Sequence, residues 1–242
     1  MKEIPLYSHP QTMYKNVQER MGHGKLNVYS ELGAVNNRLA ELGLRATTLR
    51  EAVQRGFASW ASCTANHPSN YPGISAWANT IAALRELLHS DGWTRRDDGN
   101  LPLTMDAKGR VSIIVSTGDE YTGMPDLTPS TQSSKGPRTV SVVEVNAQQK
   151  PLFDFKKHPE IVKQGEERLT WILLFHRDKA SNEVRCELSC PVKMDEDGQI
   201  DAWAERIILP SIPFGGDDVE VRSDVPKTPQ IEVKIKRKTK RA

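Results

Sequence analysis

Apolar positions recur every three or four residues in three stretches of the N-terminal half, and each stretch predicts an amphipathic helix. The first covers residues 30–42. The second begins at Thr48, where Thr48 and Glu51 have the spacing of a capping box. The third follows Pro72 and ends at residues 91–92, an Asp-Gly pair. Because each apolar stripe needs a surface to cover it, we expect the three helices to pack together.

Beyond the third helix the pattern favours strands. Residues 101–105 and 110–115 flank a turn with Gly109 at its end, which predicts a β-hairpin. Residues 139–145 alternate in a way that predicts another strand. Between them, residues 117–138 are rich in Gly, Pro, Ser and Thr and show no periodicity. A segment of that length without regular structure is either functional or disordered.

The C-terminal part of the chain carries almost only strand signals. Residues 171–175 are continuously apolar, as in a strand buried on both faces, and residues 184–188 alternate between apolar and polar. Residues 203–209 and 231–235 predict two further strands. The expected fold class is therefore α+β, with an N-terminal helical cluster on a small antiparallel sheet, followed by a mainly β C-terminal half.

These segments suggest two domains within the 242 residues. Residues 1–146 form the first, an α+β domain with three helices, the hairpin and the long loop. Residues 147–168 mix polar and helical material and are the expected linker or boundary. A mainly β domain follows over residues 169–235. Residues 236–242 form a basic tail.

Composition is that of a globular protein, with 37% hydrophobic and 26% charged residues, so disorder of the whole chain is not expected. The net charge of +2 hides an uneven distribution. From Lys227 onward, seven basic residues face one acid, while residues 1–226 are mildly acidic. Such a tail suits phosphate backbones or acidic protein surfaces. The residues expected to contact nucleic acid are Lys234, Lys236, Arg237, Lys238, Lys240 and Arg241.

The sequence predicts no membrane association and a cytoplasmic location. The first residues contain no apolar segment typical of a signal peptide, and the longest strong apolar run, residues 171–175, is too short to cross a bilayer. The three cysteines are few and odd in number, which favours reduced thiols over a disulfide framework.

A metal site formed by cysteines is not expected. Cys63 and His67 have a suggestive spacing, as do Cys186 and Cys190. However, residues 186 and 190 on one strand lie about 13 Å apart, because a strand rises about 3.3 Å per residue. One zinc ion could not bind both thiolates at about 2.3 Å. We therefore expect neither a metal nor a cofactor.

One pentapeptide near the predicted linker has an interaction motif. Gln149-Lys-Pro-Leu-Phe153 carries a Gln followed by a Leu-Phe pair, and it resembles the bacterial sliding-clamp-binding peptide. The resemblance implies that Gln149, Leu152 and Phe153 bind a protein partner, with the apolar pair in a pocket of the clamp. The alternative is that Leu152 and Phe153 anchor the linker on the protein's own core.

The long loop holds the second candidate site. Asp119 and Glu120 follow a predicted strand, and Lys135 and Arg138 lie near the other end of the loop. Together these side chains could hold a metal or a phosphate, since loops on a rigid scaffold often carry sites. The alternative is a solvated loop in which the carboxylates are only turn residues.

These features favour a non-enzymatic, nucleic-acid-associated binding protein, such as an accessory factor in DNA replication, repair or a mobile element. The basic tail is the main reason, and the clamp-like peptide is consistent with it. One alternative is an unfamiliar enzyme with its site in the loop at 117–138. Another is a scaffold subunit of a larger protein complex.

Overall fold

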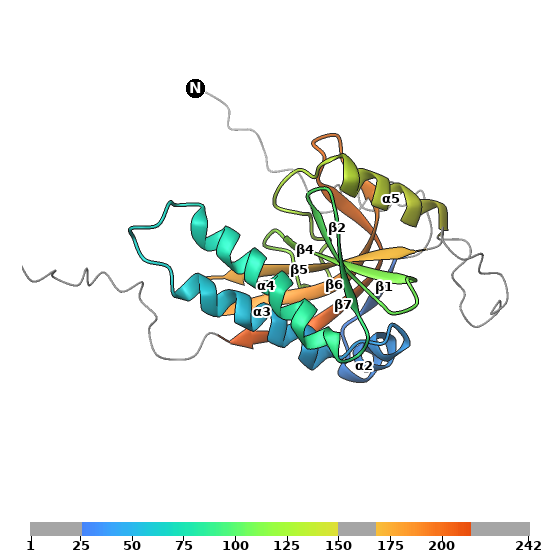
Figure 1. The fold of residues 1–242 in the computed structure, drawn as a ribbon, viewed down its shortest axis with the longest axis horizontal. Coiled ribbons are helices and arrows are strands. Elements are labelled where there is room, and N and C mark those ends of the chain that lie inside the picture. Colours follow the sequence, from blue (N-terminus) through green and yellow to red (C-terminus); the bar gives the residue numbers. More distant parts are fainter. Residues whose placement is uncertain (1–25, 150–167, 214–242) are drawn as a thin grey trace, which may run out of the picture.

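The computed structural model describes residues 26–149 and 168–213 (Figure 1). The predicted strand at 231–235 and the basic tail, residues 236–242, lie outside the described residues. So do Leu152, Phe153 and most of the predicted linker.

Within these described ranges, seven strands form one sheet in the order β1-β7-β6-β5-β4-β3-β2. Two neighbouring pairs, β1 with β7 and β4 with β5, are parallel, and the other four pairs are antiparallel. The strands are β1 (Asn27–Tyr29), β2 (Thr94–Asp98), β3 (Leu101–Met105), β4 (Val111–Thr117), β5 (Leu169–Asp178), β6 (Glu183–Met194) and β7 (Ile200–Pro213).

The expected combination of helices and strands is confirmed, but the expected small antiparallel sheet is wrong. The sheet is mixed, and it contains strands from both predicted domains: β4, from the first, is hydrogen-bonded to β5, from the second. The predicted hairpin is confirmed as β3 and β4, with Gly109 in the left-handed region at a φ of 69°. The strands predicted at 184–188 and 203–209 are confirmed as parts of β6 and β7.

Helices cover both faces of this sheet. Three of them, α2 (Leu32–Glu41), α3 (Ala46–Ala61) and α4 (Tyr71–His89), lie on one face, while α5 (Pro137–Gln149) lies on the other (Figure 1). The three predicted N-terminal helices are thus confirmed. The capping box is wrong, because α3 begins before Thr48 and buries that side chain.

The strand predicted at 139–145 is also wrong, since these residues belong to α5. The valines of this stretch favour strands, yet the buried positions are Thr139, Val143 and Asn146, which share one side of a helix. Packing of that side on β5 and β6 outweighs the intrinsic preference of β-branched residues.

The apolar run at 171–175 is confirmed as the centre of β5, where all five side chains are buried. Trp171 and Phe175 point to the core under α2, α3 and α4, while Ile172 and Leu174 point to the smaller core under α5. Because both faces of β5 are covered, the strand does not alternate between apolar and polar residues.

Asn146 connects α5 to the sheet. Its Nδ2 donates to the carbonyl oxygens of Thr170, at 2.8 Å, and of Pro191, at 3.0 Å. Its Oδ1 accepts the backbone N–H of Thr170 at 3.0 Å. The side chain therefore satisfies buried backbone groups of both β5 and β6.

Replacing Asn146 with alanine is expected to lower the free energy of unfolding by about 2–3 kcal/mol, because buried backbone groups lose their partners. Urea denaturation followed by circular dichroism would measure this. Ser141→Ala, on the exposed side of α5, is the control and should stay within about 0.5 kcal/mol of the wild type. Equal stability of the two variants would contradict this role of Asn146.

Candidate functional site

The segment between β4 and α5, residues 118–136, has the position in the fold at which a site is expected. β4 and β5 are parallel neighbours, and α5 lies between them in the sequence. In open sheets with such a unit, ligands bind beyond the carboxyl ends of the strands. We call residues 118–136 the β4–α5 loop. It runs over the α5 face of the sheet, above β6 and β7.

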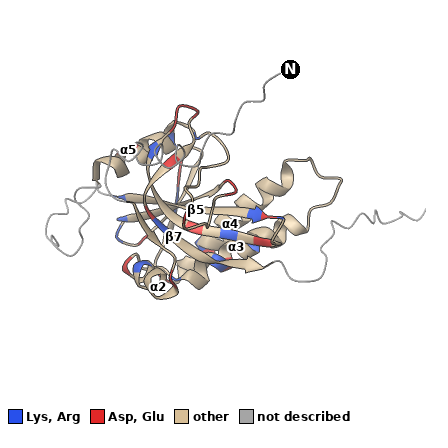
Figure 2. Cartoon of the chain, turned by 180° about the vertical axis from the view of Figure 1, so that it is seen from behind, with Lys and Arg blue, Asp and Glu red and all other residues tan. Residues whose placement is uncertain are grey.

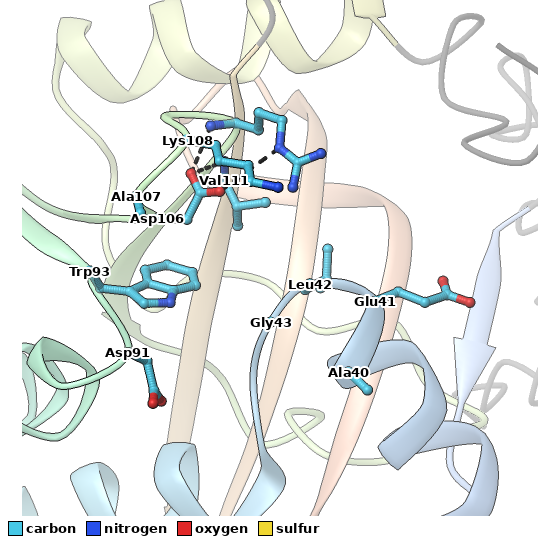
Figure 3. Close-up of a pocket in the computed structure, with 11 residues that line it drawn as sticks. Ala40, Glu41, Leu42, Gly43, Asp91, Trp93, Asp106, Ala107, Lys108 and Val111 are labelled. Carbon is cyan, nitrogen blue, oxygen red and sulfur yellow. Dashed lines mark hydrogen bonds and ion pairs between the residues drawn. The ribbon is translucent and has the colours of Figure 1, made fainter. Parts of the chain in front are cut away.

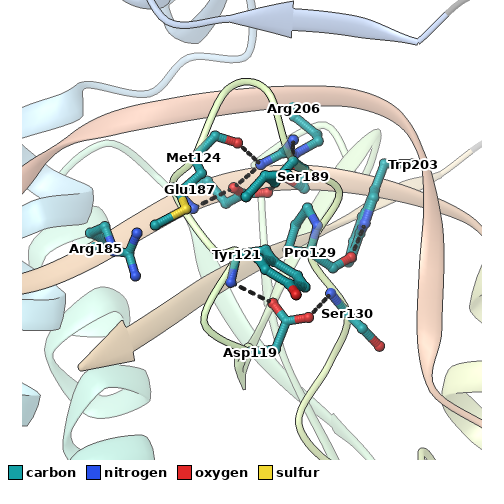
Figure 4. A network of polar contacts seen from close by, with 12 residues as sticks. Asp119, Tyr121, Met124, Pro129, Ser130, Arg185, Glu187, Ser189, Trp203 and Arg206 are labelled. Carbon is teal, nitrogen blue, oxygen red and sulfur yellow. Dashed lines mark hydrogen bonds and ion pairs between the residues drawn. The ribbon is translucent and has the colours of Figure 1, made fainter. Parts of the chain in front are cut away.

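A buried ion pair in the sheet fastens this loop (Figure 4). Arg206 of β7 donates from Nε and Nη2 to the two carboxylate oxygens of Glu187 of β6, at 3.0 and 2.6 Å. Both side chains are at most 1% exposed. Arg206 also donates to the carbonyl oxygens of Leu127, at 2.6 Å, and Met124, at 3.0 Å. One guanidinium therefore joins two strands and the loop.

The Glu187 carboxylate is fully bonded as well. It accepts the Ser189 hydroxyl at 2.6 Å and the backbone N–H of Gly123 at 2.8 Å. Gly123 has a φ of 75°, and a Cβ there would lie 2.9 Å from the Cβ of Arg185. The loop is thus held close to the sheet at a position that only glycine fits.

No motif or periodicity in the sequence predicted this network. Arg185, Glu187 and Ser189 are the polar residues of the alternating pattern in β6, yet all three are buried beneath the loop. In Figure 2, blue and red segments lie within the sheet near the β5 and β7 labels. The only available signal was the charge on Glu187 within an otherwise uncharged stretch, residues 186–191.

Of the predicted loop residues, Asp119 shapes the loop itself. Its carboxylate accepts the backbone N–H groups of Tyr121, at 3.1 Å, and Ser130, at 2.9 Å. Burial raises the pKa of Asp119 above its ordinary value. Glu120 is exposed, and its backbone carbonyl accepts Arg185 Nη2 at 2.8 Å.

Lys135 lies elsewhere, at the carboxyl end of β4. Its Nζ donates to Ser116 Oγ at 2.8 Å, and its backbone N–H donates to Gly198 at 2.8 Å. Its side chain is half-buried and makes no ion pair within the described residues. Burial lowers the pKa of Lys135. The fourth predicted residue, Arg138, pairs with Asp98 at 2.9 Å. The four residues therefore occupy three separate places.

Asp98 lies in a group of arginines, which we call the arginine cluster: Arg96, Arg138 and Arg168. Arg96 is directly opposite Leu103, which faces the α5 core, so Arg96 points to that face too. Arg168 donates from Nη1 to the Met105 sulfur at 3.6 Å. Burial and, second, the nearby Arg96 lower the pKa of Arg168. Asp98 thus interacts with Arg138 and Arg168, and Arg96 lies near Arg168.

A cavity of about 610 Å³ lies on the opposite face of the sheet (Figure 3). It is bordered by the end of α2, the residues after α4 and the β3–β4 turn, with Trp93 in its wall. All three of its carboxylates are already engaged, and Glu41 pairs with Arg38 at 2.6 Å. Asp91 pairs with Arg45, and Asp106 accepts the backbone N–H groups of Arg110 and Val111. This lining shows no arrangement typical of catalysis.

Within residues 26–149 and 168–213, no group of three or more metal-ligating side chains is found. Cys63, Cys186 and Cys190 are buried, and burial raises the pKa of Cys186 to about 12. Gln149, from the clamp-like pentapeptide, is buried at the end of α5. No helix of the described part is long and apolar enough to cross a membrane.

Exposed large apolar side chains do not gather in one place in the described part of the chain. They are spread over β1, α2, α4, the β4–α5 loop and α5. They are Val28, Leu32, Tyr71, Ile74, Tyr121, Leu127 and Val145.

Comparison with other proteins adds no family to this description. No protein-family model, no curated protein and no solved structure matches the chain.

Proposed function

We propose that this chain is a nucleic-acid-associated binding protein of the cytoplasm, whose non-enzymatic role as an accessory factor in DNA replication, repair or a mobile element requires no catalytic step. The observation that supports the proposal is the arginine cluster. Arg96, Arg138 and Arg168 lie on one face near the edge strand β2, and Asp98 is the carboxylate among them within the described residues.

A phosphate group would relieve the electrostatic cost of this cluster. The nearby Arg96 disfavours the charge of Arg168, and Arg168 Nε is buried without a hydrogen-bond partner within the described residues. Guanidinium groups bind phosphate oxygens through paired N–H donors, and they are more weakly hydrated than ammonium groups. Since β2 is at the edge of the sheet and mostly exposed, a nucleic-acid backbone has access to Arg96.

The basic tail contributes a second set of contacts in this proposal. Its cations bind phosphates without reading bases, so the expected binding depends on salt more than on sequence. A protein partner also belongs to the proposal, through Gln149, Leu152 and Phe153 and a sliding clamp. Because Gln149 is buried at the end of α5, clamp binding would require the last turn of that helix to open.

The test measures affinity for duplex DNA at several salt concentrations. Each lost phosphate contact reduces the magnitude of the slope of log affinity against log salt concentration by about 0.9. The double variant Arg96→Ala with Arg168→Ala should therefore reduce this slope by about 2. Replacing Arg237, Lys238, Lys240 and Arg241 with alanine should reduce it by up to about 4. Weak dependence on sequence is expected for all variants.

The matched control is Arg55→Ala. Arg55 is an exposed arginine of α3, on the other face of the sheet, paired with Glu51 at 2.6 Å. Its removal should leave the slope unchanged. A wild-type protein that binds neither DNA nor RNA at low salt would overturn the proposal. If the slope fell by the same amount in the Arg55 control and in the cluster variant, overall charge, rather than the cluster, would be responsible for DNA binding.

A further inference from the structure

Ser116 and Lys135 form a pair that the nucleic-acid proposal does not use. We propose that they are the nucleophile and general base of an acyl-transfer site that hydrolyses small acyl esters. The supporting observation is the hydrogen bond that Lys135 Nζ donates to Ser116 Oγ at 2.8 Å, at the carboxyl end of β4, where the Ser116 hydroxyl donates to the carbonyl oxygen of Thr117 at 3.2 Å.

The two side chains are held on rigid parts of the fold. Ser116 is in β4, paired with Leu174 of β5 in the interior of the sheet. Lys135 is fixed by its backbone hydrogen bond to Gly198 and by the start of α5 two residues later. A nucleophile and a base within hydrogen-bond distance, both positioned by the scaffold, are the geometric requirement for activating a serine.

The surroundings of Lys135 favour its use as a base. An ammonium group is usually stabilised by water or a carboxylate. Lys135 is half-buried, and no carboxylate pairs with it within the described residues. Burial lowers its pKa, so the neutral amine that can accept a proton from Ser116 is reached at lower pH than for an ordinary lysine. Serine–lysine pairs can replace the histidine of the more familiar triads.

Two backbone donors that could bind an oxyanion flank Lys135 in the sequence. The backbone N–H groups of Ser134 and Gly136, on either side of Lys135, donate to no acceptor within the described residues. Acyl transfer needs such donors to stabilise the tetrahedral intermediate. Ser116 is only 5% exposed, so the acyl group must be small and unbranched to reach it.

The proposed reaction has two steps. Ser116 Oγ attacks the ester carbonyl carbon while neutral Lys135 takes the hydroxyl proton. The carbon–oxygen bond to the alcohol then breaks, and Lys135 returns the proton to the departing oxygen. Water attacks the acyl-serine next, with Lys135 taking a proton from it and passing that proton to Ser116 Oγ as the second ester bond breaks. No oxidant, reductant or metal is consumed.

The experiment uses the full chain with p-nitrophenyl acetate and a small alkyl fluorophosphonate, with the modified residue identified by peptide mass spectrometry. We expect the phosphonate on Ser116, and no modification of that site in Ser116→Ala. Lys135→Met should slow labelling by at least about 100-fold, the usual contribution of a general base. The rate should rise with pH and level off below the ordinary pKa of lysine.

Two further variants keep the result interpretable. Lys135→Arg retains the positive charge but cannot act as a base, so its labelling should be as slow as that of Lys135→Met. Slow labelling of the arginine variant therefore means that the effect of methionine does not come from a disturbed fold. Ser181→Ala, in the turn between β5 and β6, should label at the wild-type rate. The proposal is overturned by no labelling of the wild type at any pH, by modification of another serine alone, or by wild-type rates in Lys135→Arg. Affinity for DNA should be unaffected, so this test is independent of the nucleic-acid proposal.

Discussion

Replacing Glu187 with leucine is expected to lower the free energy of unfolding by about 3–5 kcal/mol. The change leaves the Arg206 guanidinium buried without its carboxylate, and it removes the acceptor for Ser189 and for the backbone N–H of Gly123. The penalty comes mainly from the uncompensated charge, since a buried cation pays its desolvation without an opposing partner. Urea denaturation at neutral pH would measure the loss.

The double variant Glu187→Leu with Arg206→Met separates charge from packing. Because it removes both charges, it should recover much of the stability lost by the single variant. The control is Glu51→Ala, which breaks an exposed ion pair with Arg55 and should cost about 0.3–0.5 kcal/mol. If the single and double variants were equally unstable, the buried charge would not be the cause.

Trp171→Ala is expected to cost about 3–5 kcal/mol, as the largest of the fully buried side chains is lost from the centre of β5. Trp171→Phe should cost far less. The Trp171 Nε1 is buried and has no hydrogen-bond acceptor within the described residues, so phenylalanine removes an unsatisfied donor along with part of the volume. Thermal and urea unfolding of both variants would measure the difference.

The comparison of the two Trp171 variants also tests the role of Arg38. Its guanidinium lies 5.8 Å from the centre of the Trp171 ring, which is within the range of a cation–π contact. Phenylalanine keeps an aromatic face toward Arg38, whereas alanine does not. A Phe variant as unstable as the Ala variant would mean that the indole nitrogen or the full ring volume is essential.

Long periodic segments could be predicted from the sequence, and short ones could not. The three N-terminal helices repeat their apolar positions over several turns, and residues 171–175 form a run that only a doubly covered strand or a buried helix explains. Residues 139–145 are too few to distinguish a period of two from one of 3.6. Their valines favoured a strand, while contacts with distant residues such as Thr170 determined the helix.

The candidate site was only partly predictable for a related reason. The loop could be recognised by its composition, and Lys135 was among its predicted residues. Ser116, Glu187 and Arg206 lie on strands, and their roles depend on which loop covers which face of the sheet. That information comes from the strand order, in which β6 and β7 follow β5 away from β4.

The pairing of β1 with β7 has a consequence for how the chain is synthesised. Asn27 pairs with Glu205, and Arg38 of α2 bonds to the same glutamate at 2.7 Å. The first of the described strands therefore has no partner among them until β7, the last described strand, has emerged from the ribosome. During that interval the apolar sides of α2 and α3 lack the sheet that covers them, so a chaperone that holds nascent helices would increase the yield of folded protein.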